Sequence, residues 1–330
     1  MRYVVIGAGA VGGTLAALLA EQGQQVLVLA RGEHAAAIRA DGIELALPTR
    51  TVRVPLEVAE SVAALELHPG DVLLLCTKGQ HSADLLADLA ARPVGASTAG
   101  ASLPVACVQN GVENERTALR RFATVLGACV VLPATHLEPG RVSAEGGPLT
   151  GLFELGRYPG GVDDLVEQVA ADLTAVGVAT TPREDVMAWK RAKLLRNLGN
   201  AVDALSGREL DEFARELEAM ARAEGVACFA AAGLSVVDDD AWADNRGARV
   251  QPLAVAGRAR AGSSSWQSLA RGTGSIEADL LNGEVVLLGR LHGVPTPVNA
   301  LLQQEANRAA AQRRAPGSVS AASLLERVRV

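Results

Sequence analysis

The chain has 330 residues, 49% of them hydrophobic, and a formal net charge of −6. This length suits two domains with ordinary cores, and the interspersed charges argue against a nucleic-acid partner, because such proteins concentrate positive charge on one surface. The long uncharged windows contain Gly, Pro or polar loop residues, so we expect no membrane span. The four cysteines lack metal-ligand spacing, which predicts reduced thiols in a cytoplasmic protein and no metal site.

Short apolar runs alternate with Ala- and Leu-rich runs in the first half of the chain. Runs at 2–7, 25–30, 71–76, 105–111, 151–156 and 177–182 are typical of strands, and runs at 12–22, 35–40 and 81–90 are typical of helices. Such alternation predicts a parallel sheet with helices on both faces. From about residue 184 the runs show helical periodicity and no convincing strand. We therefore predict an α/β fold, with a Rossmann-like dinucleotide-binding domain at 1–183 and an all-helical domain at 184–330.

The first predicted strand is followed by glycines with the spacing G-x-G-x-x-G. Gly7 permits a tight turn, Gly9 lets the backbone approach a pyrophosphate, and Gly12 lets the next helix pack on the strand. The first turn of that helix, with Ala10 and Val11, offers backbone N–H groups and a positive dipole end to the phosphates. These five residues therefore predict a dinucleotide site.

The end of the second predicted strand indicates which dinucleotide is bound. Arg31 stands where an NAD-binding unit usually places Asp or Glu. A guanidinium group there suits the 2′-phosphate of NADP through charge-assisted hydrogen bonds. The alternative is that Arg31 only flanks a loop and Glu33 holds the ribose. The sequence favours NADPH/NADP.

Two further polar loops follow later predicted strands, Thr77–Gln80 and Gln109–Gly111. In an open α/β sheet, ligands bind at the carboxyl ends of the strands, where these loops lie. An ordinary turn is the alternative for Asn110-Gly111. Because both loops share an edge with the glycine loop, Gln80 and Asn110 become candidate cofactor residues.

A lysine and two asparagines recur at helical spacing in the run MAWKRAKLLRNLGNAVDAL at 187–205. On one continuous helix, Lys193, Asn197 and Asn200 lie within an arc of about 60°. Such a face is usually solvated, and the alternative is that it lines a site and binds a polar ligand. This run alone leaves both interpretations open.

Together, these motifs resemble the ketopantoate reductase (2-dehydropantoate 2-reductase) family. The resemblance rests on GAGAVG, VLARG, CTKGQ, QNG, the K-x-x-x-N helix and SSSWQSLARGTGSIEADLLNG, and it runs from about residue 1 to 305. It implies a helical second domain, NADPH-dependent reduction of a 2-oxo acid, most simply ketopantoate to pantoate in pantothenate and coenzyme A biosynthesis, and a homodimer through the helical domain.

The resemblance also implies roles for single residues. Lys193 matches the family's catalytic lysine, which we expect to donate a proton to the substrate oxygen. Asn197 matches a substrate-binding asparagine, and Asn110 matches the asparagine that contacts substrate and nicotinamide. Ser265 and Glu277, twelve positions apart, match the serine and glutamate that bind substrate and support the lysine. Lys78 matches the cofactor-side lysine, and Glu277 is also assigned to the cofactor.

One position departs from the family pattern. The family usually has a second asparagine eight residues after the lysine, where this chain has Ala201, with Asn200 one place earlier. On a helix, that shift turns the amide by about 100°, so Asn200 could face the substrate but could not make the same contact. A divergent reductase for another 2-oxo acid is therefore an alternative, as is a non-catalytic NADP-sensing protein. A longer segment at 238–262 could reshape the pocket mouth or an oligomer contact.

The histidines are not expected to contribute to the chemistry. His34, His68, His81, His136 and His292 are scattered, and no two have the spacing of a metal-binding pair. We expect most of them on the surface or in loops.

Overall fold

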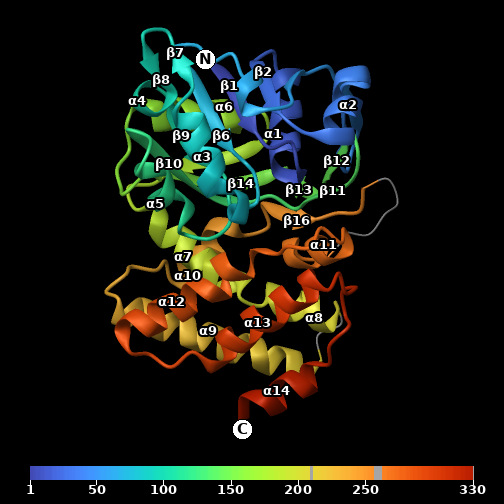
Figure 1. The fold of residues 1–330 in the computed structure, drawn as a ribbon, viewed down its shortest axis with the longest axis vertical. Coiled ribbons are helices and arrows are strands. Elements are labelled where there is room, and N and C mark those ends of the chain that lie inside the picture. Colours follow the sequence, from blue (N-terminus) through green and yellow to red (C-terminus); the bar gives the residue numbers. More distant parts are fainter. Residues whose placement is uncertain (209–210, 256–261, 330) are drawn as a thin grey trace. The chain divides into compact units, whose positions relative to one another are not determined.

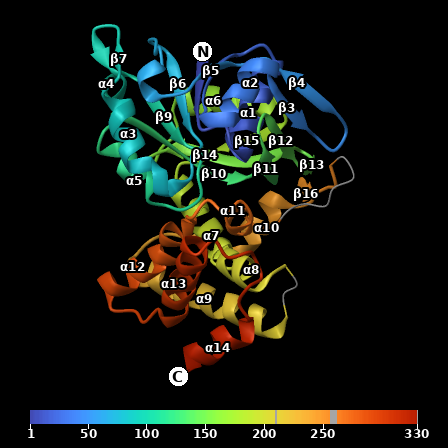
Figure 2. The same cartoon turned by 45° about the vertical axis from the view of Figure 1, so that its right-hand side comes forward.

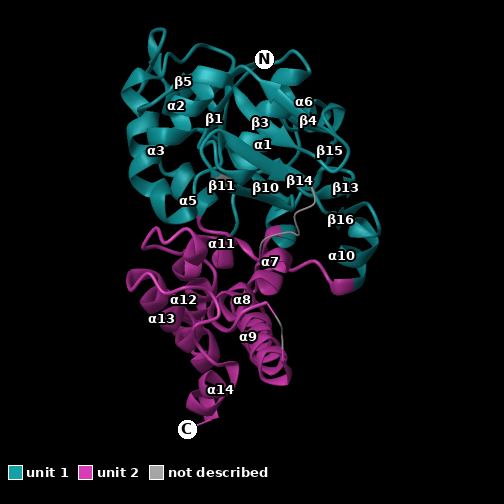
Figure 3. Cartoon of the chain, turned by 90° about the vertical axis from the view of Figure 1, so that its right-hand side faces the viewer, with its two compact units in different colours: residues 1–110, 114–189, 240–260 teal, residues 111–113, 190–239, 261–330 magenta. Residues whose placement is uncertain are grey.

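The structure, a computed structural model, describes residues 1–208, 211–255 and 262–329. The chain forms two compact units (Figure 3). Unit 1 comprises residues 1–110, 114–189 and 240–260, and unit 2 comprises residues 111–113, 190–239 and 261–330. Part of the 238–262 segment, residues 256–261, lies outside the described residues.

Unit 1 is built on an eight-stranded sheet with the order β15-β14-β10-β9-β6-β1-β2-β5. Every neighbouring pair in it is parallel except β10 and β14, which are antiparallel. All five residues of β6 are buried, as expected of a parallel strand covered on both faces. The strands are β1 (Arg2–Ile6), β2 (Gln25–Leu29), β5 (Glu57–Ala59), β6 (Asp71–Leu75), β9 (Pro104–Cys107), β10 (Thr124–Val131), β14 (Gly151–Arg157) and β15 (Val178–Pro182).

Helices cover both faces of this sheet (Figures 1 and 2). On β1, Tyr3 and Val5 belong to one hydrophobic cluster and Val4 and Ile6 to another, because successive strand residues point to opposite faces. Helices α1 and α6 contribute to the first cluster and helices α3 and α5 to the second. The helices and 3₁₀ turns of this part are α1 (Ala10–Glu21), α2 (Gly32–Asp41), η1 (Val62–Ala64), η2 (Gly79–His81), α3 (Ser82–Ala90), α4 (Ala99–Ser102), α5 (Asn114–Leu119) and α6 (Asp164–Ala175).

A second sheet of four strands, with the order β11-β12-β3-β4, packs against α1. The sequence did not predict it. A Cβ atom on Gly13 of α1 would lie 2.9 Å from side-chain atoms of both Ile43 and Val142, so a glycine allows this close packing. Its strands are β3 (Ile43–Ala46), β4 (Thr51–Val54), β11 (Ala134–Glu138) and β12 (Arg141–Ala144); two small pairs add β7 (Pro93–Val94) with β8 (Ser97–Thr98), and β13 (Gly146–Pro148) with β16 (Val250–Pro252).

The secondary-structure elements of unit 2 are all helices or 3₁₀ turns among its described residues. Its core contains a polar network at Asn299, which is fully buried: its amide nitrogen donates to the Ala221 carbonyl and to the Glu224 carboxylate, and its Oδ1 accepts from Asn282. The Glu224 carboxylate also accepts the backbone N–H groups of Val298 and Asn299, and so caps the start of α13. The helices are α7 (Val186–Asn197), which begins in unit 1, α8 (Asn200–Ser206), α9 (Glu212–Ala231), α11 (Ser264–Ala270), η3 (Glu277–Leu280), α12 (Asn282–His292), α13 (Pro297–Ala311) and α14 (Ala321–Arg329).

The predicted fold class is confirmed: a mostly parallel sheet with covering helices is followed by a helical region. The limits of the compact units differ from the predicted boundary near residue 183, since the division falls after Trp189 and residues 240–260 return to unit 1. The return segment contains α10 (Asp239–Arg246) and β16, a strand within the region predicted to be all-helical. Because β16 pairs with β13, it belongs to unit 1. No helix of the described residues is long and apolar enough to cross a membrane.

Candidate functional site

The glycine loop between β1 and α1 has the conformation that its spacing predicts. Gly7 has a φ of +102°, which favours glycine, and a Cβ atom there would lie 2.8 Å from Cγ2 of Thr77. At Gly12 a Cβ atom would lie 2.0 Å from the Gly7 carbonyl oxygen and 2.8 Å from Cβ of Cys76. The turn and the packing of α1 against the strands therefore require glycine at both positions.

The same loop provides space and donors for a dinucleotide phosphate. Gly9 precedes α1 without a side-chain cap, and a Cβ atom on it would meet nothing within 4 Å. Ala10 and Val11 form the first turn of α1, where backbone N–H groups have no intrahelical partner. Beside the loop, the Thr77 hydroxyl is buried and has no hydrogen-bond partner among the described residues. These features fit a pyrophosphate at the start of α1.

Two polar loops lie at the same edge of the sheet as the glycine loop. In the register, Ile6 is opposite Leu75, and Leu75 is opposite Cys107, so the loops that follow β1, β6 and β9 begin side by side. This arrangement places the candidate cofactor residues Lys78, Gln80 and Asn110, all partly buried, at the edge that the sequence predicted.

Gln109 holds these two loops together. Its side chain is 5% exposed, and its amide nitrogen donates to the Thr77 carbonyl at 2.7 Å and to the Ser82 hydroxyl at 2.8 Å. The following residue, Asn110, accepts a hydrogen bond on its carbonyl from the side chain of Asn114. We predicted no role of its own for Gln109, although an amide directly after a buried strand is a usable signal for such a contact.

Arg31 and Glu33 are both exposed at the start of α2, which follows β2. The side chain of Arg31 makes no hydrogen bond or ion pair with any described residue, and its backbone carbonyl accepts the N–H of Ala35. Both side chains are thus available to a ligand, and the choice between a 2′-phosphate on Arg31 and a ribose on Glu33 stays a prediction.

Two histidines differ from the expectation of surface or loop positions. His34 lies in α2 and His136 in β11, both partly buried, with ring centroids 4.2 Å apart. Both ring nitrogens of His34 are hydrogen-bonded to backbone groups, one of them in the glycine loop. Isolated histidines in a sequence carry no signal for such long-range contacts.

The helix that carries Lys193 is interrupted after Asn197, so the one continuous helix on which a shared face was predicted for three residues does not form. Helix α7 ends at Asn197 and α8 begins at Asn200. At the interruption, the Leu198 carbonyl accepts a hydrogen bond from the Asn282 side chain, and a Cβ atom on Gly199 would lie 2.6 Å from Oε1 of Glu218. Lys193 and Asn197, four residues apart on α7, do share a face.

Asn200 and Ala201 open α8 and have different surroundings. Ala201 is 3% exposed and belongs to the core of unit 2. Asn200 is partly buried, and its carbonyl accepts a hydrogen bond from the Ser263 hydroxyl at 3.4 Å. At the position where the family that the chain resembles usually has its second asparagine, this chain thus has the buried methyl group of Ala201.

Ser265 and Glu277 are buried in unit 2, at 3% and 4% exposed. Ser265 lies in the first turn of α11, which is joined to α8 because the Ser263 backbone N–H donates to the Asp203 carboxylate at 2.8 Å. Burial lowers the pKa of Arg271, and the nearby Glu277 carboxylate opposes that shift. Unit 2 therefore holds a buried carboxylate, a buried hydroxyl and the partly buried Lys193.

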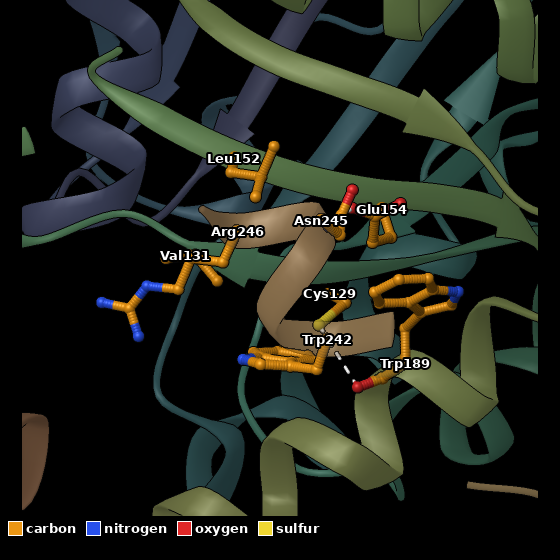
Figure 4. Close-up of a pocket in the computed structure, with 8 residues that line it drawn as sticks. All are labelled: Cys129, Val131, Leu152, Glu154, Trp189, Trp242, Asn245 and Arg246. Atoms are coloured by element: carbon orange, nitrogen blue, oxygen red, sulfur yellow. Dashed lines mark hydrogen bonds between the residues drawn. The ribbon is translucent and has the colours of Figure 1, made fainter. Parts of the chain in front are cut away.

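A small hollow in unit 1 contains none of the predicted site residues (Figure 4). It has room for about one water molecule. Its lining residues come from β10, β14, α7 and α10: Cys129, Val131, Leu152, Glu154, Trp189, Trp242, Asn245 and Arg246. We regard it as a packing feature of the return segment. Among the described residues, no group of three or more His, Cys, Asp or Glu side chains could hold a metal ion.

The fold and the glycine loop define a class, the dinucleotide-binding α/β proteins. Comparison with known proteins narrows it. Two family models match the chain, "Ketopantoate reductase PanE/ApbA" over residues 3–160 and "Ketopantoate reductase PanE/ApbA C terminal" over residues 185–310. The chain belongs to this family, and the predicted family membership is confirmed.

Individual relatives agree with that assignment. A 2-dehydropantoate 2-reductase of Mesorhizobium japonicum is 30% identical, with 92% of this chain and 96% of the relative covered. One from Pyrococcus horikoshii is 25% identical over 197 residues; the match covers 60% of this chain and 61% of that relative, or about three fifths of its length. The crystal structure of a PanE/ApbA family ketopantoate reductase from Ralstonia eutropha has a TM-score of 0.77 and 28% identity, covering 95% of this chain and 99% of that one.

Proposed function

We propose that this protein reduces a 2-oxo acid to a 2-hydroxy acid with NADPH, most simply 2-dehydropantoate to pantoate in the route to pantothenate and coenzyme A. The observation that carries the proposal is the glycine loop, open at Gly9, in a chain of this family that retains Lys193. Relatives named 2-dehydropantoate 2-reductase support the substrate. We further propose that 1–183 is the cofactor domain and 184–330 the substrate and dimerisation domain of a cytoplasmic homodimer.

The reaction needs a hydride on the carbonyl carbon and a proton on its oxygen. The reduced nicotinamide supplies the hydride when it is bound. The Lys193 ammonium group hydrogen-bonds the carbonyl oxygen, stabilises the negative charge that develops on it and delivers the proton. Asn197 and Ser265 orient the substrate by hydrogen bonds to its carboxylate and hydroxyl groups, and Glu277 supports the lysine.

Replacing Lys193 tests the assigned proton donor. Lys193→Met keeps the apolar stem and removes the ammonium group, so turnover should fall roughly 10²–10⁴-fold while the affinity for NADPH changes little. NADPH oxidation is followed with 2-dehydropantoate and a panel of other 2-oxo acids. The matched control is Arg191→Met, which removes a cation of the same helix that donates to Ser235.

The outcomes of that assay distinguish the proposed function from its two alternatives. Normal turnover in Lys193→Met would contradict the assigned proton donor. A best substrate other than 2-dehydropantoate would favour the divergent reductase, the alternative that buried Ala201 supports. Tight binding of NADPH with no oxidation by any 2-oxo acid would favour a non-catalytic NADP-sensing protein.

The preference for NADPH is tested at Arg31. Its exposed guanidinium is proposed to bind the 2′-phosphate, so Arg31→Ala should raise the Kd for NADPH roughly 10-fold or more and leave the Kd for NADH unchanged. Glu33→Ala is the matched control, two residues away and equally exposed. If Glu33→Ala weakens the binding of NADH and Arg31→Ala weakens the binding of neither nucleotide, then the ribose is held by Glu33 and the NADP assignment fails. Nucleotide titrations followed by calorimetry measure the six dissociation constants, for the wild type and both variants with each nucleotide.

A further inference from the structure

The Ala8 carbonyl lies at the centre of the glycine loop, and its hydrogen-bond partner is a protein side chain. Ala8 is 3% exposed, and a buried backbone carbonyl requires a hydrogen-bond donor. His34 provides one from α2, because its Nε2 lies 2.7 Å from the Ala8 oxygen. A carbonyl oxygen can only accept, so the proton is on Nε2. The backbone between Gly7 and Gly9 is thus bonded to a side chain of a different element.

The other ring nitrogen of His34 is also engaged. Its Nδ1 accepts the backbone N–H of Gly140 at 2.8 Å, in the turn between β11 and β12. A Cβ atom on Gly140 would lie 2.9 Å from Cβ of Ala37, so this turn packs directly on α2. The imidazole therefore links the glycine loop to the second sheet, and it can do so only as the neutral tautomer with its proton on Nε2.

The surroundings of His34 favour that neutral form. Burial lowers the pKa of His34, and the hydrogen bond to the Ala8 carbonyl opposes this only in part. The ring that faces it is the imidazole of His136 on β11. Residues 7–9 and the first turn of α1 carry no charge. The charged groups on the adjoining elements are Arg31 just before α2, Glu33, Arg39 and Asp41 on α2, Glu138 and Arg141, which pair with each other across the turn, and Glu44 on β3.

We propose that His34 is a positioning residue for cofactor binding: by holding the Ala8 carbonyl, it keeps the glycine loop in the shape that receives the dinucleotide phosphates. The inference rests on the proposed cofactor site and adds a residue that does not itself touch the reacting atoms. Protonation of Nδ1 would turn the acceptor of the Gly140 N–H into a second donor, and the two N–H groups would repel each other. Acidification should therefore release the loop.

The sign of the pH effect follows from the lowered pKa of His34. The folded glycine loop binds the neutral form of the His34 ring. The stabilisation of the loop by His34 is therefore complete above the ordinary histidine pKa of about 6.5, and it is lost as the pH falls through the lower pKa of the folded state. The affinity for NADPH should decrease as the pH is lowered. In a cofactor site without this link, the affinity would change with pH only through the titration of the nucleotide.

Two substitutions of His34 each keep one of its two hydrogen bonds and so test them individually. In His34→Gln, the amide nitrogen takes about the place of Nε2 and can still donate to Ala8. In His34→Asn, the amide oxygen takes about the place of Nδ1 and can accept from Gly140, but the side chain is too short to reach Ala8. His68→Gln is the matched control, because His68 is an exposed histidine of unit 1. Calorimetry gives the Kd for NADPH from about pH 5.5 to 8, and circular dichroism checks folding.

We expect His34→Asn to raise the Kd roughly 10-fold at neutral pH, as for loss of a hydrogen bond to a buried group, with His34→Gln close to wild type. The Kd of the wild type and of His68→Gln should rise towards acid, and the Kd of His34→Gln should rise less. Equal Kd values for His34→Asn, His34→Gln and wild type at all pH values would overturn the inference and leave the proposed function intact. Failure of the wild type to bind NADPH or NADH would instead reject the proposed cofactor site, and this inference with it.

Discussion

At the scale of single residues, the glycines of the cofactor loop serve two different purposes. Gly12 is required by the fold, because a Cβ atom there would lie 2.0 Å from the Gly7 carbonyl oxygen. Gly9 is not, since a Cβ atom there would enter open space and its φ of −67° suits any residue. The space beside Gly9 is where a pyrophosphate would approach the start of α1.

This contrast predicts opposite results for two identical substitutions. Gly9→Ala should leave the free energy of unfolding within about 1 kcal/mol of wild type, since alanine adopts this backbone conformation, but should raise the Kd for NADPH roughly 10-fold or more. Gly12→Ala should lower the free energy of unfolding by about 1–3 kcal/mol, because the helix must move away from the strands. Urea unfolding and nucleotide titration measure the two quantities. Unchanged affinity in Gly9→Ala would place the phosphates elsewhere.

Sequence spacing predicts the glycine loop because its turn and the start of α1 are formed by residues that are neighbours in the chain. Asn200 shows the opposite case, because helical arithmetic placed it on the face of Lys193 and the structure ends that helix at Asn197. The interruption involves Asn282, 84 positions from Leu198. Contacts of that length leave no periodic trace in the sequence.

At the scale of elements, Asn245 of the return segment α10–β16 is hydrogen-bonded to the ion pair of Glu154 with Arg183, in which the carboxylate is buried and the guanidinium is partly exposed. The Glu154 side chain is 3% exposed; it accepts from Nε of Arg183 at 2.5 Å and from the amide of Asn245 on α10 at 2.6 Å. The Arg183 guanidinium also lies over the Trp189 ring at 4.4 Å. Burial raises the pKa of Glu154 even though Arg183 and Asn245 act to lower it.

Removing the cation should therefore destabilise the protein in a pH-dependent way. Arg183→Met leaves a buried carboxylate without its counter-ion and should lower the free energy of unfolding by about 3–5 kcal/mol near pH 8. A carboxyl group with a raised pKa favours folding in its protonated form, so the loss should shrink as the pH falls towards about 5. Urea unfolding at both pH values measures this.

An exposed pair provides the control for that measurement. Arg50→Met breaks the ion pair with Glu21, whose side chains are 49% and 32% exposed, and should cost about 0–1 kcal/mol at either pH. If Arg183→Met behaves like Arg50→Met, the pair of Glu154 with Arg183 does not hold the return segment.

Element-level prediction from the sequence succeeds for the parallel sheet and fails for the second sheet. The central strands have near-continuous apolar runs, which are recognisable without knowledge of their partners. Strands β3 and β4 have four residues each and β16 has three, too few for a pattern to stand out. Their existence depends on pairing, and β3 pairs with β12 about 100 positions away.

At the scale of the whole molecule, the alternation of strands and helices was sufficient to predict the fold class, and the change to helical periodicity was sufficient to predict a second, helical region. The course of the chain between the two units could not be predicted. The chain passes from unit 1 to unit 2 at Asn110 and returns at Asn114, passes again after Trp189, and returns at residue 240. Each return depends on contacts that form only in the folded protein.

This course has a consequence for how the protein is made. At about 5–20 residues per second, several seconds separate the synthesis of Trp189 from that of α10 and β16, with residues 190–239 of unit 2 in between. Until then, Glu154 lacks Asn245 and β13 lacks its partner strand. Unit 1 therefore cannot be completed on the ribosome before part of unit 2 has been made. A single crossover between genes within residues 190–239 would likewise separate these partners, so the two units are best inherited together.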